Sequence, residues 1–238
     1  MRKTDDPVPA ERLRTDVAAL LDVLADGGVA IAPLDVAYAI LAAKSGGIRR
    51  IFDAKQRSYE KPSGMFGDWK LSAELHVMPD ARHAMVREIV IEEKIPFSVV
   101  APFHADHPLL RAVEPFVLES SSKAGTLDML LNAGQFHDEI ARQAQDRGMP
   151  VFGSSANTSL SGSKYDYADI DEPVRAAADI HFDYGRSKYA NPDGRSSTII
   201  DFRDFSVVRV GVCFDRLQQA FKTRFDVDLM ESAQGAAT

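Results

Sequence analysis

The spacing of hydrophobic residues along the chain predicts its secondary structure. From Leu13, apolar side chains recur every three or four residues as far as Leu24, and Gly27 and Gly28 follow. This pattern predicts an amphipathic helix that stops at the two glycines. A second helix is expected after Ser45, its predicted N-cap, and the same period predicts helices at residues 80–94, 136–147, 174–178 and 214–225.

Short apolar runs predict the strands. They lie at residues 29–32, 71–78, 97–101, 127–131, 149–152, 180–182, 197–202 and 207–210. The last two flank Arg203 and Asp204, as the strands of a hairpin would. Helices and strands interleave without strict alternation, which predicts an α/β (α+β) fold with a mixed sheet and helices on its faces. We expect one domain over residues 13–225, with loose termini at 1–12 and 226–238.

Composition and charge exclude several classes of protein. With 238 residues and a formal net charge of −7, the chain does not coat nucleic acid through a general basic surface, although a local basic pocket is compatible with that charge. The single cysteine, Cys213, rules out an internal disulfide and a cysteine metal cage. The N-terminus lacks the apolar core of a signal peptide, and no apolar run approaches the roughly 20 residues that span a bilayer. A soluble, cytoplasmic protein is therefore expected.

Two polar segments are candidates for chemistry. The first is a cation cluster directly after the second predicted helix: Lys55, Arg57 and Lys61. Taken alone, such a cluster most often complements the helix dipole or faces solvent. The second is the pair His104 and His107, which has metal-ligand spacing. No third ligand on a helix or strand accompanies this pair, so no metal site is predicted.

Four segments, taken in order along the chain, resemble the motifs of one protein family. They are Pro33-x-Asp35-x-x-Tyr38, then Lys55-x-Arg57 with Lys61-Pro62, then Ser154-Ser155-Ala156-Asn157-Thr158-Ser159-Leu160-Ser161-Gly162, and finally Ser197-Thr198-Ile199-Ile200-Asp201 with Arg209-x-Gly211. Together they resemble the YrdC/Sua5 family from about residue 20 to residue 211. The resemblance implies a YrdC-like fold, a mixed twisted sheet flanked by helices around a basic cavity.

The resemblance also implies an activity. Members of this family make threonylcarbamoyl-adenylate from L-threonine, bicarbonate and ATP, for the t6A modification of tRNA. ATP would be a substrate that arrives with Mg²⁺. The chain has neither a G-x-x-x-x-G-K-[ST] loop nor a G-x-G-x-x-G loop, so side chains and exposed N–H groups would have to bind the phosphates.

The family's site residues carry over by position. Lys55 and Arg57 match the catalytic K-x-R pair, which would hold phosphate and the carboxylated amine and stabilise the charge that develops on the α-phosphate. The expected nucleotide contacts are Lys61, Ser154, Ser155, Asn157, Ser197 and Arg209. The expected contacts of the amino-acid substrate are Leu34, Asp35 and Tyr38, with Asp35 orienting its loop through hydrogen bonds.

The chain departs from the family pattern on the amino-acid side. Leu34 and Val36 replace the threonines that flank the aspartate, and neither the P-G-P-x-T segment nor the R-x-P segment is found after the middle strand. Synthesis of a carbamoyl-adenylate from ATP, bicarbonate and an amino-acid-like acceptor is the leading hypothesis, with L-threonine as the default acceptor. Two alternatives are a nucleotide- or double-stranded-RNA-binding module without synthase activity, and a carbamoyltransferase that acts on another acceptor. Neither a membrane contact nor a particular protein partner is predicted.

Overall fold

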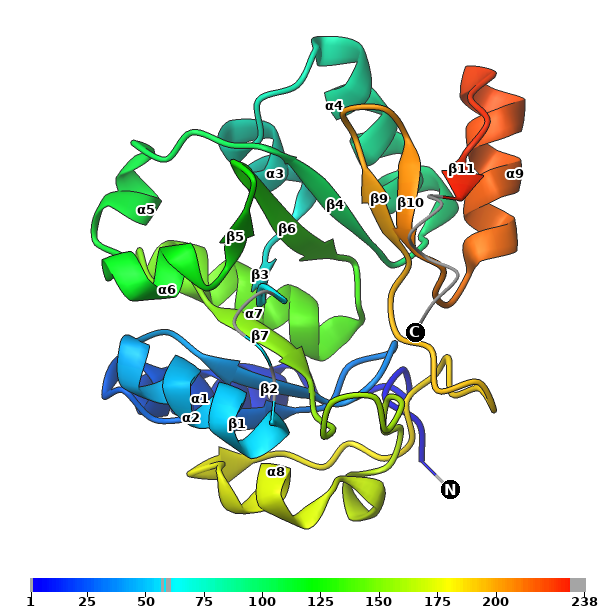
Figure 1. Ribbon diagram of the computed structural model, residues 1–238. Helices are drawn as coiled ribbons and strands as arrows, with labels where there is room; N and C mark the ends of the chain where they lie inside the picture. Colours follow the sequence, from blue (N-terminus) through cyan, green and yellow to red (C-terminus); the bar gives the residue numbers. More distant parts are fainter. Residues whose placement is uncertain (1, 57, 59–60, 232–238) are drawn as a thin grey trace.

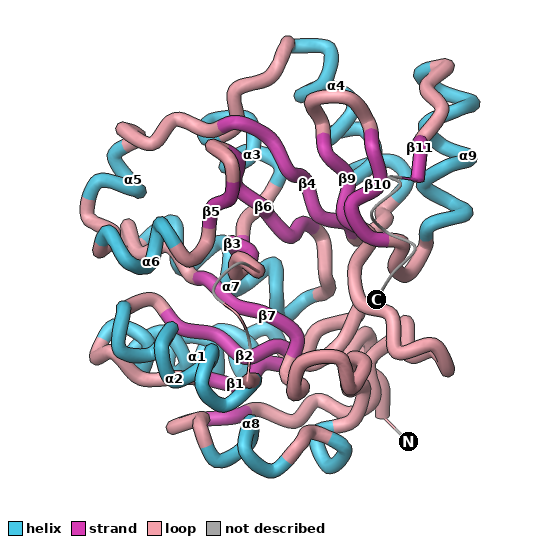
Figure 2. The backbone as a smooth tube through the Cα atoms, viewed as in Figure 1, coloured by secondary structure: helices cyan, strands magenta, loops and turns pink. Residues whose placement is uncertain are grey.

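A mixed sheet runs through the molecule, with helices on both faces (Figures 1 and 2). The computed structural model describes residues 2–56, 58 and 61–231. Its strands are β1 (Ala30–Ala32), β2 (Ala39–Ala42), β3 (Gly64–Phe66), β4 (Phe97–Pro102), β5 (Ser122–Lys123), β6 (Thr126–Leu131), β7 (Phe152–Ser155), β8 (Ile180–His181), β9 (Ile199–Asp201), β10 (Ser206–Arg209) and β11 (Met230–Glu231).

The strands follow the order β11-β10-β9-β4-β6-β3-β7-β2-β1-β8, and β5 lies beside β6. Parallel and antiparallel pairs are mixed, since β6 runs antiparallel to β4 but parallel to β3. The predicted hairpin around Arg203 and Asp204 is present as β9 and β10. The prediction of a mixed α/β (α+β) sheet flanked by helices is confirmed.

The helices largely follow the predicted periodicity. They are α1 (Ala10–Ala25), α2 (Ser45–Lys55), α3 (Trp69–Leu75), α4 (Asp80–Glu88) with the π-helical turn η1 (Ile89–Glu93), α5 (Pro108–Arg111), α6 (Pro115–Glu119), α7 (Gln135–Asp146), the 3-10 turn η2 (Tyr167–Asp169), α8 (Glu172–Ala176) and α9 (Phe214–Phe225). Ser45 was predicted to cap α2, but it is the first helical residue, and the N-cap is Lys44 without a side-chain capping bond. In the described part of the chain, no helix is long and apolar enough to span a membrane.

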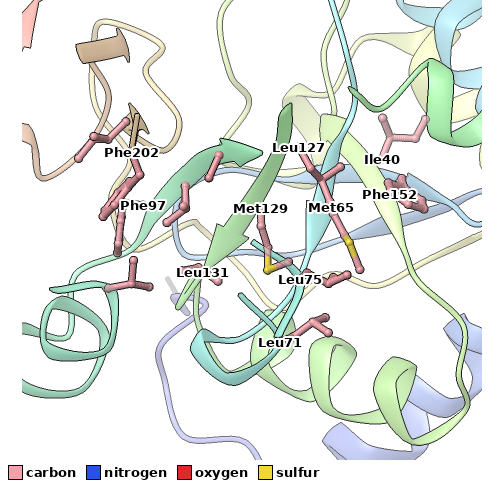
Figure 3. Packing of buried hydrophobic residues seen from close by; sticks show 14 of the residues in the cluster. Ile40, Met65, Leu71, Leu75, Phe97, Leu127, Met129, Leu131, Phe152 and Phe202 are labelled. Atoms are coloured by element: carbon pink, nitrogen blue, oxygen red, sulfur yellow. The ribbon is translucent and has the colours of Figure 1, made fainter. Parts of the chain in front are cut away.

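The two faces of the sheet bury different side chains because alternate residues of a strand point to opposite sides. On one face, Phe97 of β4 and Leu131 of β6 pack in a cluster with residues of α3, α4 and α9 (Figure 3). On the other face, α1 and α7 pack together over β1 and β2, through residues such as Leu21 and Phe136. The part of this second face that belongs to β3, β4, β6 and β9 carries the site described below.

Two predicted strands are wrong. Residues 71–78 were predicted as a strand, but residues 71–75 belong to α3, and the Asp68 side chain caps this helix by accepting a hydrogen bond from the N–H of Leu71. Of residues 149–152, only Phe152 is in a strand, and β7 continues to Ser155. The two serines at 154 and 155 therefore lie within the sheet, which fixes their positions more tightly than a loop would.

The termini were predicted to be loose, and the described parts of both are tied to the fold. Thr4 is buried at 4% exposure, its hydroxyl donates to Asp35 Oδ1 at 2.8 Å, and it accepts from the N–H of Lys188 at 3.1 Å. At the other end, Leu229 is buried and β11 pairs with β10. The prediction was based on polarity and prolines, and it missed these long-range partners. Residues 1 and 232–238 lie outside the described part of the chain.

The contacts of Thr4 lead to a first prediction. Thr4→Val keeps the shape of the side chain but removes both hydrogen bonds, which leaves the buried Asp35 carboxylate without this donor. We expect the free energy of unfolding to fall by about 1–3 kcal/mol, measured by urea denaturation. The control is Thr15→Val, because the Thr15 hydroxyl bonds only the Glu11 carbonyl on the exposed side of α1. Equal stability of Thr4→Val and the parent would contradict an anchoring role.

Candidate functional site

A pocket of about 140 Å³ opens on the sheet face opposite to α3, α4 and α9. Strand alternation explains its floor: Ser98, Asp128 and Ile199 point into it, while their sequence neighbours point into the core. Gly64 of β3 leaves space on this floor for the Asp128 carboxylate, because a Cβ atom there would lie 3.2 Å from Asp128 Oδ2. The loop that begins at Leu34 closes one side of the pocket.

Arg209 and Ser197 form one wall of the pocket. The Arg209 guanidinium donates to the Ser197 carbonyl through Nε at 3.1 Å and Nη2 at 2.8 Å, and Nη2 also lies 3.0 Å from Ser197 Oγ. Although Arg209 as a residue is exposed, its charged end lies low in the pocket, where burial lowers its pKa and the Asp128 carboxylate raises it. An arginine stays cationic under these conditions. Arg209 therefore offers a fixed positive charge to a ligand.

The described lining of the pocket carries charges of both signs. Its charged members are Arg209 and Asp128, in contrast to the basic cavity that the sequence predicted. The ammonium group of Lys55 is turned to protein carbonyls, and the exposed Lys61 lies outside the lining. Arg57 lies outside the described residues. Among those that are described, the cavity is of mixed charge.

Lys55 connects α2 to the loop that carries the serines and the asparagine. It is buried at 2% exposure, and its Nζ donates to the backbone carbonyls of Ser155 and Asn157. Ser155 Oγ in turn donates to Asn157 Oδ1 at 2.5 Å. A buried ammonium needs oxygen acceptors, and these carbonyls supply them. In this structure Lys55 thus holds the loop of Ser155 and Asn157 in place, and its predicted contact with phosphate stays a prediction.

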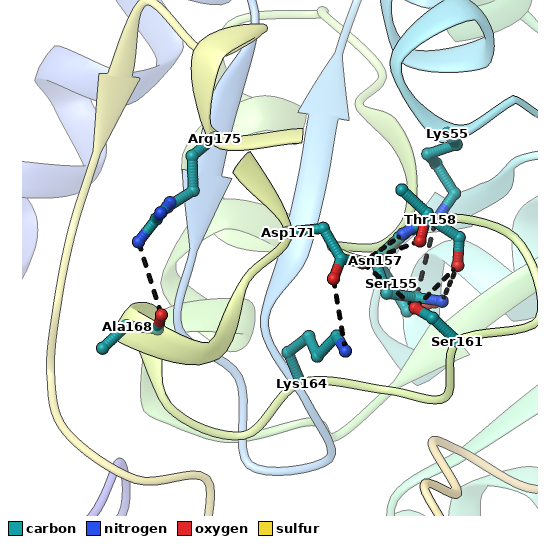
Figure 4. A network of polar contacts seen from close by, with 9 residues as sticks. All are labelled: Lys55, Ser155, Asn157, Thr158, Ser161, Lys164, Ala168, Asp171 and Arg175. Carbon is teal, nitrogen blue, oxygen red and sulfur yellow. Dashed lines mark hydrogen bonds and ion pairs between the residues drawn. The ribbon is translucent and has the colours of Figure 1, made fainter. Parts of the chain in front are cut away.

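A carboxylate holds the same loop from the other side (Figure 4). Asp171 Oδ2 accepts from the N–H of Thr158 at 2.7 Å, from the Thr158 hydroxyl at 2.9 Å and from the Ser161 hydroxyl at 3.0 Å, and Lys164 Nζ lies 3.4 Å from Oδ1. Burial raises the pKa of Asp171, but these hydrogen bonds and the Lys164 charge outweigh it and lower the pKa to about 2. The carbonyls of the loop face a cation and its N–H and hydroxyl groups face an anion.

Residues of the first motif form part of the pocket wall and also make hydrogen bonds behind that wall. Leu34 lines the pocket with its side chain buried at 2% exposure. Tyr38 also borders the pocket, but its ring is fully buried and its hydroxyl donates to Asp183 Oδ1 at 2.7 Å. Burial and then the hydrogen bond to Asp183 raise the pKa of Tyr38. Asp35 lies outside the lining, where burial raises its pKa and the hydrogen bond from Thr4 opposes that shift. Its predicted role of orienting the loop stays a prediction.

Residues from all four motifs border the pocket, the second motif through Pro62. The predicted site residues that border it are Leu34, Tyr38, Ser154, Ser155, Ser197 and Arg209. Lys55 and Asn157 lie directly behind Ser155 through hydrogen bonds, whereas Asp35 and Lys61 are not part of the lining. None of the predicted ligand contacts is tested by an unliganded fold, so each stays a prediction.

Sequence reasoning missed three polar residues of the pocket, Ser98, Asp128 and Ser196. Ser98 Oγ lies 3.4 Å from Ser197 Oγ. A signal for it existed, because Pro96-x-Ser98 has the spacing of the P-x-T end of the segment that was sought further along the chain. Asp128 gave no signal of its own, since one acid within an apolar run can face either side of a sheet. Among the described residues, no group of three or more His, Cys, Asp and Glu could hold a metal ion.

Comparisons with known proteins agree with the motifs. The family model Sua5_yciO_yrdC, described as "Telomere recombination", matches residues 22–211. A search of curated proteins finds no match.

Several solved structures share the fold. A hypothetical protein, smu.1377c from Streptococcus mutans UA159, has a TM-score of 0.76 at 18% identity, over 94% of both chains. Sua5 of P. abyssi in complex with L-threonine has a TM-score of 0.68 at 16% identity, over 90% of this chain and 58% of its own. HypF in a phosphate- and nucleotide-bound form has a TM-score of 0.60 at 12% identity, over 84% of this chain and 33% of its own. Identities this low establish the fold alone.

The Asp171 contacts predict a pH dependence. Because the pKa of this carboxyl is lowered from 3.8 to about 2 in the folded state, its stabilising effect is complete above pH 4 and is lost as the pH falls toward 2. We expect Asp171→Asn to flatten this part of the stability curve, measured by urea denaturation between pH 6 and pH 2.5. The exposed Asp106→Asn is the control and should keep the parent's curve. If the stability of Asp171→Asn fell with pH as steeply as that of the parent, the predicted contribution of the Asp171 hydrogen bonds would be contradicted.

The burial of Lys55 predicts its main role. Lys55→Met keeps the length of the side chain but removes the ammonium donor from the carbonyls of Ser155 and Asn157. We expect the free energy of unfolding to fall by about 2–5 kcal/mol, measured by thermal and chemical denaturation. Lys123→Met on the exposed strand β5 is the control. Unchanged stability together with lost nucleotide binding would show instead that Lys55 acts as a phosphate ligand.

Proposed function

The chain belongs to the Sua5/YciO/YrdC family, and on that premise we propose that it is an ATP-dependent synthase that joins an amino acid and bicarbonate to AMP. The reaction yields a carbamoyl-adenylate and releases pyrophosphate. Its family counterpart is threonylcarbamoyl-adenylate, the precursor of the t6A modification of tRNA. ATP enters with Mg²⁺ as its counter-ion, carried by the phosphates.

One observation carries this proposal: segments far apart in the sequence meet at one pocket. The loop at Leu34, the end of β7 at Ser154 and Ser155, and the pair Ser197 and Arg209 border the same space. Hydroxyl groups and a fixed guanidinium are the donors that phosphate oxygens need. They stand beside an apolar wall suited to a small organic substrate.

The size of the pocket fits the reacting groups better than a whole nucleotide. Its volume of about 140 Å³ is below the roughly 300–1,000 Å³ of pockets that bury drug-sized ligands. We infer that the amino acid and the α-phosphate occupy the pocket, and that the rest of ATP extends past its mouth. P. abyssi Sua5 with L-threonine and HypF with phosphate and nucleotide support ligands of these two kinds.

The chemistry needs a charge-stabilising site and no covalent nucleophile. The amine and bicarbonate condense to a carbamate and release water. A carbamate oxygen then attacks the α-phosphate, and pyrophosphate leaves. A cation held against the α-phosphate stabilises the negative charge that grows there. Arg209 is the described side chain suited to this role, because its hydrogen bonds to Ser197 fix its orientation before substrate arrives.

A single assay tests the proposal. We expect pyrophosphate release from ATP, Mg²⁺ and bicarbonate to depend on an added amino acid, and mass spectrometry to detect the carbamoyl-adenylate. Arg209→Met should lower kcat/KM by about 100-fold or more, whereas Arg111→Met, an exposed change on α5, should leave it unchanged. Measurable ATP binding without turnover for any amino acid would contradict the synthase and favour a nucleotide-binding module.

A further inference from the structure

Asp128 is unexpected in a pocket proposed to hold phosphate. It lies on β6 opposite Val100 of β4 and points to the pocket side of the sheet, where its charge acts on the Arg209 guanidinium. A carboxylate repels phosphate and attracts a cation. The chemical partner that suits Asp128 is therefore a positively charged group of the other substrate.

Gly64 gives the Asp128 carboxylate its space on the pocket floor. A Cβ atom at residue 64 would lie 3.2 Å from Asp128 Oδ2, so the missing side chain makes room for the carboxylate beside the pocket. Asp128 Oδ1 is buried, so the other carboxylate oxygen is the one that would accept a hydrogen bond from an ammonium group.

The next pocket position along β6 is apolar. Leu130 follows Asp128 by two residues, which places it about 6.5 Å further along the strand, and it pairs with Phe66 of β3. Leu34 and Val36 add apolar surface from the facing loop, both almost fully buried. A ligand about one amino acid long would thus meet a carboxylate at one end and aliphatic or aromatic carbon at the other.

We propose that the pocket selects an α-amino acid with an aliphatic side chain, of about the size of valine, and that Asp128 recognises its ammonium group. This inference rests on the proposed function in one respect: it assumes that the substrate joined to bicarbonate and AMP is an amino acid. The same arrangement places the acceptor nitrogen close to Arg209, where the α-phosphate would lie. L-threonine, which has a hydroxyl in place of one methyl group of valine, would bury that hydroxyl against Leu34, Val36 and Leu130 without a hydrogen bond from any of these side chains.

The test compares ligands of equal shape by calorimetry, without ATP. The probes are L-valine, L-threonine and L-2-hydroxyisovalerate, in which a hydroxyl replaces the ammonium group of valine. We expect the parent protein to bind L-valine at least 10-fold more tightly than either of the other two. Asp128→Asn should weaken L-valine binding by about 10- to 100-fold and bring it close to that of the hydroxy acid. Asp106→Asn is the control and should bind as the parent does.

A second variant keeps the test decisive if Asp128→Asn folds poorly. Leu34→Thr should shift the preference from L-valine toward L-threonine, because a hydroxyl then faces the ligand. Equal or tighter binding of L-threonine by the parent, or unchanged L-valine binding by a folded Asp128→Asn variant, would overturn the inference. The inference would also be overturned if the parent protein bound ATP in a separate titration but bound none of the amino acids. Because these measurements need no turnover, their failure is distinguishable from failure of the synthase assay.

Discussion

The buried ammonium group of Lys55 is the interaction on which the arrangement of the site depends. A charge removed from water must find acceptors, and Lys55 finds them in the carbonyls of Ser155 and Asn157, 100 and 102 residues further along the chain. This contact joins the end of α2 to the end of β7. Because β7 pairs with β2 and β3, the position of the loop is set by the centre of the sheet.

Opposite charges on the two sides of the loop explain its shape. Lys55 donates hydrogen bonds to carbonyl oxygens of the loop. Asp171 accepts hydrogen bonds from the N–H and hydroxyl groups of Thr158 and from the hydroxyl of Ser161. A loop held in this way needs little reorganisation when a ligand arrives, which is what electrostatic catalysis requires. The cation that the family pattern suggested as a ligand contact is, in this chain, also a structural element of the loop.

The pocket itself combines two kinds of recognition. Its Arg209 and Ser197 wall offers fixed donors to an anion, and its Asp128 and Leu130 floor offers a carboxylate and an apolar surface. A uniformly basic cavity would favour any polyanion, including RNA. A cavity of mixed charge can hold an anionic group beside a cationic one.

Sequence alone determined the family, the mixed α/β fold and most helices. The order of the motifs and the hydrophobic period can both be recognised in the sequence without knowledge of the tertiary contacts. The prediction failed at 71–78, where residues 71–75 belong to α3 with Asp68 as its N-cap. Only the tertiary structure decided that Lys55 faces the loop carbonyls, that Thr4 anchors the N-terminus, and that Asp128 faces the pocket. Each of these three contacts depends on which distant segment of the chain packs beside the residue. The pairing of strands that are far apart in the sequence determines which segment that is.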